Sequence, residues 1–440
     1  MNSKYYESLA ERRSRSYKDL SSALEIVKKF IKDQNLILYG GMAIDLALKL
    51  KGSGIYPDDT IPDYDFMSPN HIQDSYILAD LLHEAGLSNI SSIQAIHGTT
   101  RKVRVNFQEA ADISYMPKTL LDNLPTLEAE GLKIVHPTYQ RMDLHLALGN
   151  LMGSAPQEVV FHRLNKDLKR LALIQEHYPI PSQDLDLRGA KQKTLTFKIP
   201  PDGVIGGFVA IALTIHSLRP LRPLREIQKL YDPKFAKHDD KITITLPPFH
   251  EEGDDWVGKQ NLIIYTDHFE KYLPKTQSAF CEYYERFLDY RPRTVLLEGI
   301  EIADTKGRLV PYQTIEGIKV VNYQWILMYL LERYFSTGNK QFLEYYKLIE
   351  DLNLELTVQT YGCCDWSFAF IKSYTELVEY INNSPERTEF REPFGYYPQS
   401  AERHPEFTLT DLEVFQIQGQ RTKPFKPLEL PKADRPKMSE

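Results

Sequence analysis

Two carboxylates one residue apart, inside an apolar segment, constrain this chain more than any other feature of its sequence. Asp63 and Asp65 flank Tyr64 in the run from Pro62 to Met67. Successive side chains of a strand point to opposite faces, so the two aspartates share one face and Tyr64 lies in the core behind it. The run therefore predicts a strand that carries a polar site on one side.

A third carboxylate, Asp112, lies in a later strand-like run in which the apolar residues Ile113 and Tyr115 have the opposite parity. Like charges in one place raise each other's pKa, so such a group favours a cation among its members. We predict that Asp63, Asp65 and Asp112 are catalytic residues that bind two metal ions, with Mg²⁺ as the natural candidate. Such a pair of ions serves an in-line displacement at phosphorus.

A glycine pair precedes these carboxylates. The apolar run 36–39 ends at Gly40 and Gly41, and a helical pattern follows. Glycine has no side chain, so the turn and the start of the helix can come close to a triphosphate. We therefore predict that Gly40 and Gly41 bind the nucleotide.

The remaining pattern alternates helices and strands, which is typical of a mixed α/β (α+β) fold. Apolar periodicity predicts helices at 5–33, 42–48, 70–82, 138–151, 157–177, 323–335, 340–352 and 366–381, with Asn70 as an N-cap. Alternation predicts strands at 101–107, 111–116, 134–135, 194–199, 241–246, 261–266, 295–302 and 318–321.

The length of 440 residues favours two domains, because single cores rarely grow so large. We expect an N-terminal helix at 1–35, a catalytic domain at 36–180, a second α/β domain at 190–384 and a proline-rich tail at 385–440. Three cysteines, no leader-like N-terminus and no long apolar run predict a soluble protein in a reducing compartment, with no membrane partner.

The net charge of −7 gives no support to nucleic-acid binding by the chain as a whole, so such a site would be a local patch. One cationic stripe on a predicted helix suits phosphate oxygens, although a solvated helix face has the same pattern. Its residues are Arg163, Lys166 and Arg170. A second basic group suits single-stranded RNA, and a surface loop without a role fits it equally well. Its residues are Arg219, Arg222, Arg225 and Lys229.

Leu38-Tyr39-Gly40-Gly41 and Asp63-Tyr64-Asp65-Phe66 resemble the signature of the polymerase-beta nucleotidyltransferase superfamily. Within it, the segment 36–170 resembles the catalytic subunits of poly(A) polymerases from poxviruses and giant viruses. The stretches that carry this likeness are Gly40–Asp45, Pro62–Phe66, Ala111–Tyr115 and His136–Met142.

The resemblance implies mRNA polyadenylation, with ATP as substrate, a single-stranded RNA 3′ end as acceptor and two Mg²⁺ or Mn²⁺ ions. It also implies that the second domain is a degenerate nucleotidyltransferase-like fold without catalytic carboxylates. We expect a homodimer or a separate processivity subunit, and a location in the cytoplasmic viral factory, with packaging in the virion as an option. Two alternatives stay open: another nucleotidyltransferase, of the terminal uridylyl or oligonucleotide synthase type, and an inactive RNA-binding scaffold.

Overall fold

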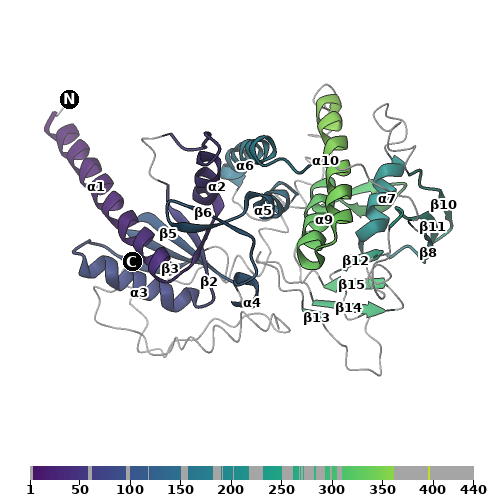
Figure 1. Cartoon of the computed structure of the whole chain (residues 1–440), viewed down its shortest axis with the longest axis horizontal. Coiled ribbons are helices and arrows are strands. Elements are labelled where there is room, and N and C mark those ends of the chain that lie inside the picture. Colours follow the sequence, from purple (N-terminus) through teal and green to yellow (C-terminus); the bar gives the residue numbers. More distant parts are fainter. Residues whose placement is uncertain are drawn as a thin grey trace, which may run out of the picture. The chain divides into compact units, whose positions relative to one another are not determined.

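The structure of the chain is a computed structural model (Figure 1). It describes residues 3–57, 62–95, 100–116, 118–149, 157–181, 190, 192–201, 203–217, 231–249, 261–266, 268, 271, 282–283, 293–297, 300–304, 310–360 and 395–396. These residues form two compact units, one within Met1–Val135 and Tyr380–Glu440, the other within His136–Glu379. The four-part division expected from the sequence stays a prediction.

The first unit contains an eight-stranded mixed sheet in the order β18-β3-β4-β5-β2-β1-β7-β6. Its strands are β1 (Ile37–Tyr39), β2 (Tyr64–Ser68), β3 (Ser91–Gln94), β4 (Thr100–Val105), β5 (Gln108–Tyr115), β6 (Thr126–Ala129), β7 (Leu132–Val135) and β18 (Gly395–Tyr396). At its centre β1 runs antiparallel to β2 and parallel to β7, while β2 runs parallel to β5. The pairing of β18 with β3 adds a segment of the tail to this sheet.

Two helices, α1 (Ser3–Asp33) and α3 (His71–Glu84), pack against each other and against the central strands (Figure 1). Their contacts show which side of each strand is apolar. Phe66 of β2 lies 6.2 Å from Phe30 of α1, and Tyr115 of β5 lies 5.4 Å from His71 of α3, measured between ring centroids. Side chains of opposite parity on β2 and β5 therefore point to the other side of the sheet.

The first unit also contains α2 (Gly40–Lys49), which contacts β1, β2, β7 and β6, and the short α4 (Lys118–Leu121). Asp45 of α2 is fully buried and accepts hydrogen bonds from the backbone N–H groups of Ile55 and Tyr56, at 2.7 and 3.1 Å. These bonds fix the chain that follows α2. Asp45 of α2 thus holds the backbone of the segment that follows the helix, within the residues described up to 57.

The second unit contains a seven-stranded sheet in the order β13-β14-β15-β12-β9-β17-β16 and a three-stranded sheet in the order β10-β11-β8. The strands are β8 (Thr194–Lys198), β9 (Val204–Gly206), β10 (Phe235–His238), β11 (Lys241–Thr245), β12 (Leu262–Thr266), β13 (Glu282–Tyr283), β14 (Arg293–Leu297), β15 (Ile300–Asp304), β16 (Tyr312–Ile315) and β17 (Ile318–Val321). In the larger sheet β9 runs antiparallel to β12 and parallel to β17, while β12 runs parallel to β15. This arrangement repeats that of the first sheet, as expected for a second domain of the same layout.

The helices of the second unit are α5 (Pro137–Gly149), α6 (Gln157–His177), α7 (Gly207–Ser217), α9 (Tyr323–Thr337) and α10 (Lys340–Thr360). The bounds of α9 follow from its ends. The side chain of Asn322 accepts a hydrogen bond from the N–H of Trp325 at 3.0 Å, and Gly338 ends the helix with a φ of 71°. No helix among the described residues is both long and apolar enough to cross a membrane.

Two sequence predictions need correction, and some elements were missed. The run 295–302 forms β14 and β15, two antiparallel strands in which Leu297 is opposite Ile300, rather than one strand. Asn70 occupies the N-cap position of α3 but makes no side-chain capping bond, while its backbone N–H donates to Ser68 Oγ. The strand β9 and the helix α7 were not predicted at all. The predicted helix 366–381 lies outside the described residues.

Candidate active site

The three predicted carboxylates come from two neighbouring strands of the first sheet. Asp65 lies in β2 and Asp63 directly precedes it, while Asp112 lies in β5. Because β2 and β5 pair in parallel with Asp65 opposite Asp112, both carboxyl groups leave the sheet on one face. Tyr64 and Phe66 are buried on the other side, as alternation predicts.

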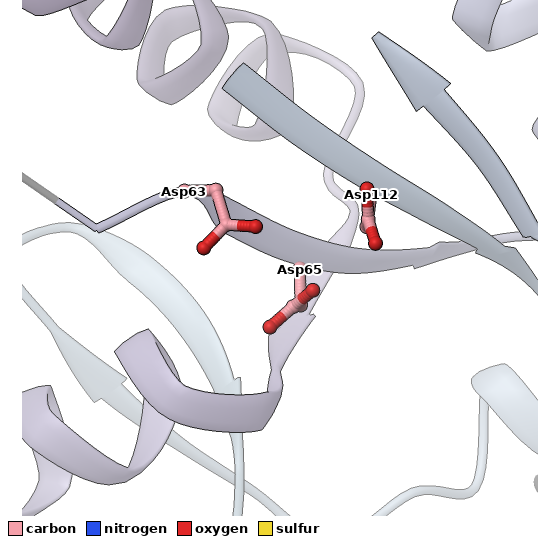
Figure 2. A group of neighbouring side chains, drawn as sticks. All are labelled: Asp63, Asp65 and Asp112. Carbon is pink, nitrogen blue, oxygen red and sulfur yellow. The ribbon is translucent and has the colours of Figure 1, made fainter. Parts of the chain in front are cut away.

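Figure 2 shows the three carboxyl groups pointing toward a shared space. One oxygen from each of Asp63, Asp65 and Asp112 lies within 4.8 Å of the others, and all three residues are half-buried. Carboxylate oxygens at this spacing are the ligands that Mg²⁺ and Mn²⁺ prefer. The donor set therefore fits a divalent metal centre.

The electrostatics of Asp112 reflect this crowding. Burial raises the pKa of Asp112 to about 6, assisted by the charge of Asp63 and opposed by Lys102. The Lys102 ammonium donates to both oxygens of Asp112, at 3.2 and 2.9 Å, and also contacts Glu109 Oε1 at 3.0 Å. Burial lowers the pKa of Lys102, but Asp112 and Glu109 outweigh this effect and the net shift is upward. A cation beside Asp112 is thus part of the site.

Gly40 shapes the edge of the site next to Asp65. Its φ is +70°, a conformation that side chains disfavour, and it begins α2 directly after β1. A Cβ at this position would lie 3.0 Å from Cγ and 3.1 Å from Cβ of Asp65. Only glycine permits both the turn and the closeness of the carboxylate. Gly41 follows it, buried in the first turn of α2.

A row of hydroxyl groups lies on the same face of the sheet. Ser114 shares its parity with Asp112, and its Oγ lies 2.7 Å from the hydroxyl of Tyr39 and 2.7 Å from Oγ1 of Thr100. Thr100 is opposite Ser114 in the pairing of β4 with β5. The open face therefore carries polar groups from β1, β4 and β5 beside the carboxylates.

The other predicted site residues belong to other parts of the chain. Arg163, Lys166 and Arg170 belong to α6 in the second unit, where Lys166 is exposed and Arg170 is half-buried 3.6 Å from Asp167. Their proposed nucleotide contacts stay a prediction. The predicted RNA-binding residues Arg219, Arg222, Arg225 and Lys229 lie outside the described residues.

Sequence reasoning assigned no role to Lys102. The residue stood in a basic cluster with Arg101 and Arg104, which gave no reason to select it. The structure separates the cluster: Arg101 is buried against Tyr76 and donates to the carbonyl of Ser92, whereas Lys102 is opposite Asp112. Alternation along β4 is the signal that could have found Lys102, once β4 was paired with β5.

Comparison with known proteins supports one family. The family model for the poly(A) polymerase catalytic subunit matches residues 25–154. An African swine fever virus protein assigned as the poly(A) polymerase catalytic subunit is 38% identical over 351 residues, covering 78% of this chain and 72% of the viral protein. A protein of the same assignment from Acanthamoeba polyphaga mimivirus is 30% identical over 167 residues, covering 38% of this chain and 27% of its own.

The crystal structure of the Megavirus polyadenylate synthase shares the fold. It superposes with a TM-score of 0.54 at 19% identity, covering 80% of this chain and 75% of the other. The likeness thus extends well beyond the segment that carries the three aspartates. The sequence match to the African swine fever virus protein covers most of both chains, and this chain therefore belongs to the family of poly(A) polymerase catalytic subunits of large DNA viruses.

Proposed function

We propose that the chain adds AMP from ATP to the 3′ end of single-stranded RNA, in mRNA polyadenylation, with two divalent ions held by Asp63, Asp65 and Asp112. The single observation that carries this proposal is the facing carboxylate group, whose oxygens lie within 4.8 Å of one another. Family membership supplies the enzyme class, a polynucleotide adenylyltransferase. The ions would lower the pKa of the attacking hydroxyl and stabilise the leaving oxygen.

The chain's own groups have distinct parts in this reaction. The N–H groups at the start of α2, at Gly40 and Gly41, bind triphosphate oxygens, because the positive end of a helix dipole favours anions. Tyr39, the N-cap residue, makes no side-chain hydrogen bond to these groups. The RNA 3′-oxygen bonds to the α-phosphorus of ATP and the bond to the β-phosphate oxygen breaks, which releases pyrophosphate. Asp112 is the carboxylate that would accept the hydroxyl proton.

The test is extension of a labelled single-stranded RNA with each of the four NTPs, in Mg²⁺ or Mn²⁺. We expect long products with ATP alone. Asp63→Asn and Asp65→Asn should each abolish extension, while the fold, followed by circular dichroism, stays intact. Asp122→Asn is the matched control, because Asp122 is exposed just after α4 and the ion pair described for it is with Lys118 of that helix, at 2.9 Å.

The outcomes separate the alternatives. Extension with UTP, or with mixed nucleotides, would retain the superfamily and change the substrate. The absence of extension with any NTP would favour an RNA-binding scaffold. Full activity in either aspartate variant would exclude the proposed site.

The proposal extends to partners and location. The relatives are assigned as catalytic subunits, which implies a second subunit in those proteins and favours a separate processivity subunit over a homodimer here. Light scattering of the purified chain tests this, since a stable dimer would support the homodimer instead. The corresponding place of action is the cytoplasmic viral factory, which fluorescence microscopy of infected cells would test.

A further inference from the structure

The ammonium group of Lys102 lies beside Asp112, one of the three carboxylates of the candidate metal centre. Lys102 is directly opposite Asp112 in the pairing of β4 with β5, so both side chains leave the same face of the sheet. The ammonium group is within hydrogen-bond distance of both Asp112 oxygens, at 2.9 and 3.2 Å. Asp112 therefore already has a positive partner, although one of its oxygens belongs to the metal-sized group.

Because the Lys102–Asp112 ion pair is largely buried, the attraction between its two charges is strong. The side chains of Lys102 and Asp112 are 19% and 16% exposed, so water screens their attraction less than at the surface. A divalent ion ligated by Asp112 would place a second cation next to the ammonium group that donates to both of its oxygens, and the two positive charges would repel each other. The ammonium group and the ion are competitors for Asp112.

A second carboxylate, that of Glu109, can remain paired with the Lys102 ammonium group when Asp112 binds a metal ion. Glu109 Oε1 lies 3.0 Å from Lys102 Nζ, and Glu109 is more exposed than Asp112, at 43%. It is not a member of the metal-sized group formed by the described residues. The ion pair with Glu109 can thus persist while the contact with Asp112 is broken.

We propose that Lys102 is a positioning residue that holds Asp112 in an ion pair until a divalent cation displaces it, with Glu109 retaining the ammonium group afterwards. The inference rests on the proposed two-metal function. It gives an order of assembly: Asp63 and Asp65 take up their ion first, and Asp112 becomes available last.

The test measures Mn²⁺ binding by electron paramagnetic resonance, without ATP or RNA, so that its readout is separate from activity. In Lys102→Met the weaker Mn²⁺ site should tighten by about tenfold, the order expected for removing a half-buried charge at this distance. Lys102→Gln should act in the same direction, which protects the result against a folding defect of one variant. Thermal unfolding checks both.

Arg104→Met is the matched control. Arg104 lies two residues from Lys102 on β4 and contacts the same Glu109 oxygen at 3.4 Å, but no contact with Asp112 is described for it. Its removal changes the net charge equally, and we expect less than about a twofold change in Mn²⁺ affinity. If Arg104→Met raised the Mn²⁺ affinity as much as Lys102→Met does, the change would follow from net charge alone, and the proposal would be overturned.

A double-mutant cycle tests the part of Glu109. Glu109→Gln should weaken the second Mn²⁺ site in the wild-type background and have a smaller effect in Lys102→Met, because the coupling runs through the lysine. Equal effects in both backgrounds would contradict this role, and unchanged or weaker binding in Lys102→Met would overturn the whole inference. If Mn²⁺ binds as described but RNA is not extended, the proposed function fails while the role of Lys102 stands.

Discussion

At the scale of single residues, Gly40 shows how closely the backbone and the site depend on each other. Its φ of +70° and its closeness to Asp65 exclude a side chain for two separate reasons. We predict that Gly40→Ala lowers the rate of RNA extension by about 100-fold, the effect of displacing a reacting group by about 1 Å. Single-turnover extension assays measure this rate.

Gly52→Ala is the control for Gly40→Ala. Gly52 also has a positive φ, +76°, but a Cβ there would meet nothing within 4 Å. Both variants should lose about 1–2 kcal/mol of stability to backbone strain, and only Gly40→Ala should lose activity. Equal activity of the two variants would show that the contact with Asp65 has no part in catalysis.

His145 gives a prediction for pH. It is fully buried in the second unit, with Nδ1 2.7 Å from Gln324 Oε1 and Nε2 2.7 Å from the Tyr346 hydroxyl, and burial lowers its pKa to about 4. In the unfolded chain His145 protonates near pH 6.5. Its contribution to the free energy of unfolding is therefore fully present above that pH and is lost as the pH falls toward 4. The contribution lost between pH 7.5 and pH 5 is about 2 kcal/mol.

Urea unfolding at the two pH values, compared with His145→Gln, measures this contribution. The difference between the wild-type and variant free energies of unfolding should change by about 2 kcal/mol between pH 7.5 and pH 5. A difference that does not vary with pH would mean that His145 binds its proton with the same pKa in the folded and the unfolded chain.

The residues of the site differ in how far the sequence predicts them. Asp63, Asp65 and Asp112 were predicted as a facing group because alternation alone decides on which face a strand residue lies. The contact of Lys102 with Asp112 depends in addition on the register of β4 against β5. That pairing contains a register shift between Val103 and Arg104, and no local pattern predicts it.

At the scale of secondary-structure elements, one arginine connects three helices of the second unit. Arg141 of α5 is fully buried, contacts Glu350 of α10 at 3.3 Å and donates to the carbonyl of Tyr178, just after α6, at 2.6 Å. Glu350 also accepts from Gln175 of α6 at 2.7 Å. Removing the guanidinium would leave a buried carboxylate without its main counter-charge.

We therefore predict that Arg141→Met destabilises the protein by about 3–5 kcal/mol. The control is Lys347→Met, which removes a cation 3.2 Å from the same Glu350 but at the surface end of the contact, with 26% exposure. Lys347→Met should lower the free energy of unfolding by less than about 1 kcal/mol. Urea unfolding compares the two, and equal losses would mean that burial does not strengthen the Arg141 contact.

Long periodic helices were the elements best predicted from the sequence, as the bounds of α6 at 157 and 177 show. Short elements were the least well predicted, because pairing with distant strands determines whether they form. Val204–Gly206 is too short to show alternation, and α7 is apolar on all sides, so neither has an amphipathic pattern. Gly207 was the overlooked signal, since it follows a short apolar run and begins a helix as Gly40 does.

At the scale of the whole molecule, the two large sheets allow a position-by-position comparison. Gly207 begins α7 with a φ of +70°, as Gly40 begins α2. Tyr39, just before Gly40, is opposite Asp65 in the first sheet. Gly206, just before Gly207, is opposite Ile263 in the second. Ile263 is in turn opposite Glu301, as Asp65 is opposite Asp112. The counterparts of Asp63, Asp65 and Asp112 are therefore Asn261, Ile263 and Glu301.

These counterparts do not form a metal centre. Ile263 offers no ligand, and the one retained carboxylate, Glu301, is buried 3.7 Å from Arg333. The start of α7 is also closed, because the N–H of Val209 donates to the carbonyl of Asn261 at 2.9 Å. The second sheet thus keeps the architecture of the first and has lost both its ligands and its open helix start.

This asymmetry predicts where the full chain binds metal. Mn²⁺ titrations followed by electron paramagnetic resonance should detect bound ions in the wild-type chain and none at the same concentrations in the Asp63→Asn/Asp65→Asn double variant. The counterpart positions described in the second sheet offer no replacement, because a lone carboxylate paired with an arginine is a poor ligand for a hard cation. Stoichiometric Mn²⁺ retained by the double variant and removed by Glu301→Gln would instead locate a metal site in the second unit, and the Arg333 contact would then have to open when the ion binds.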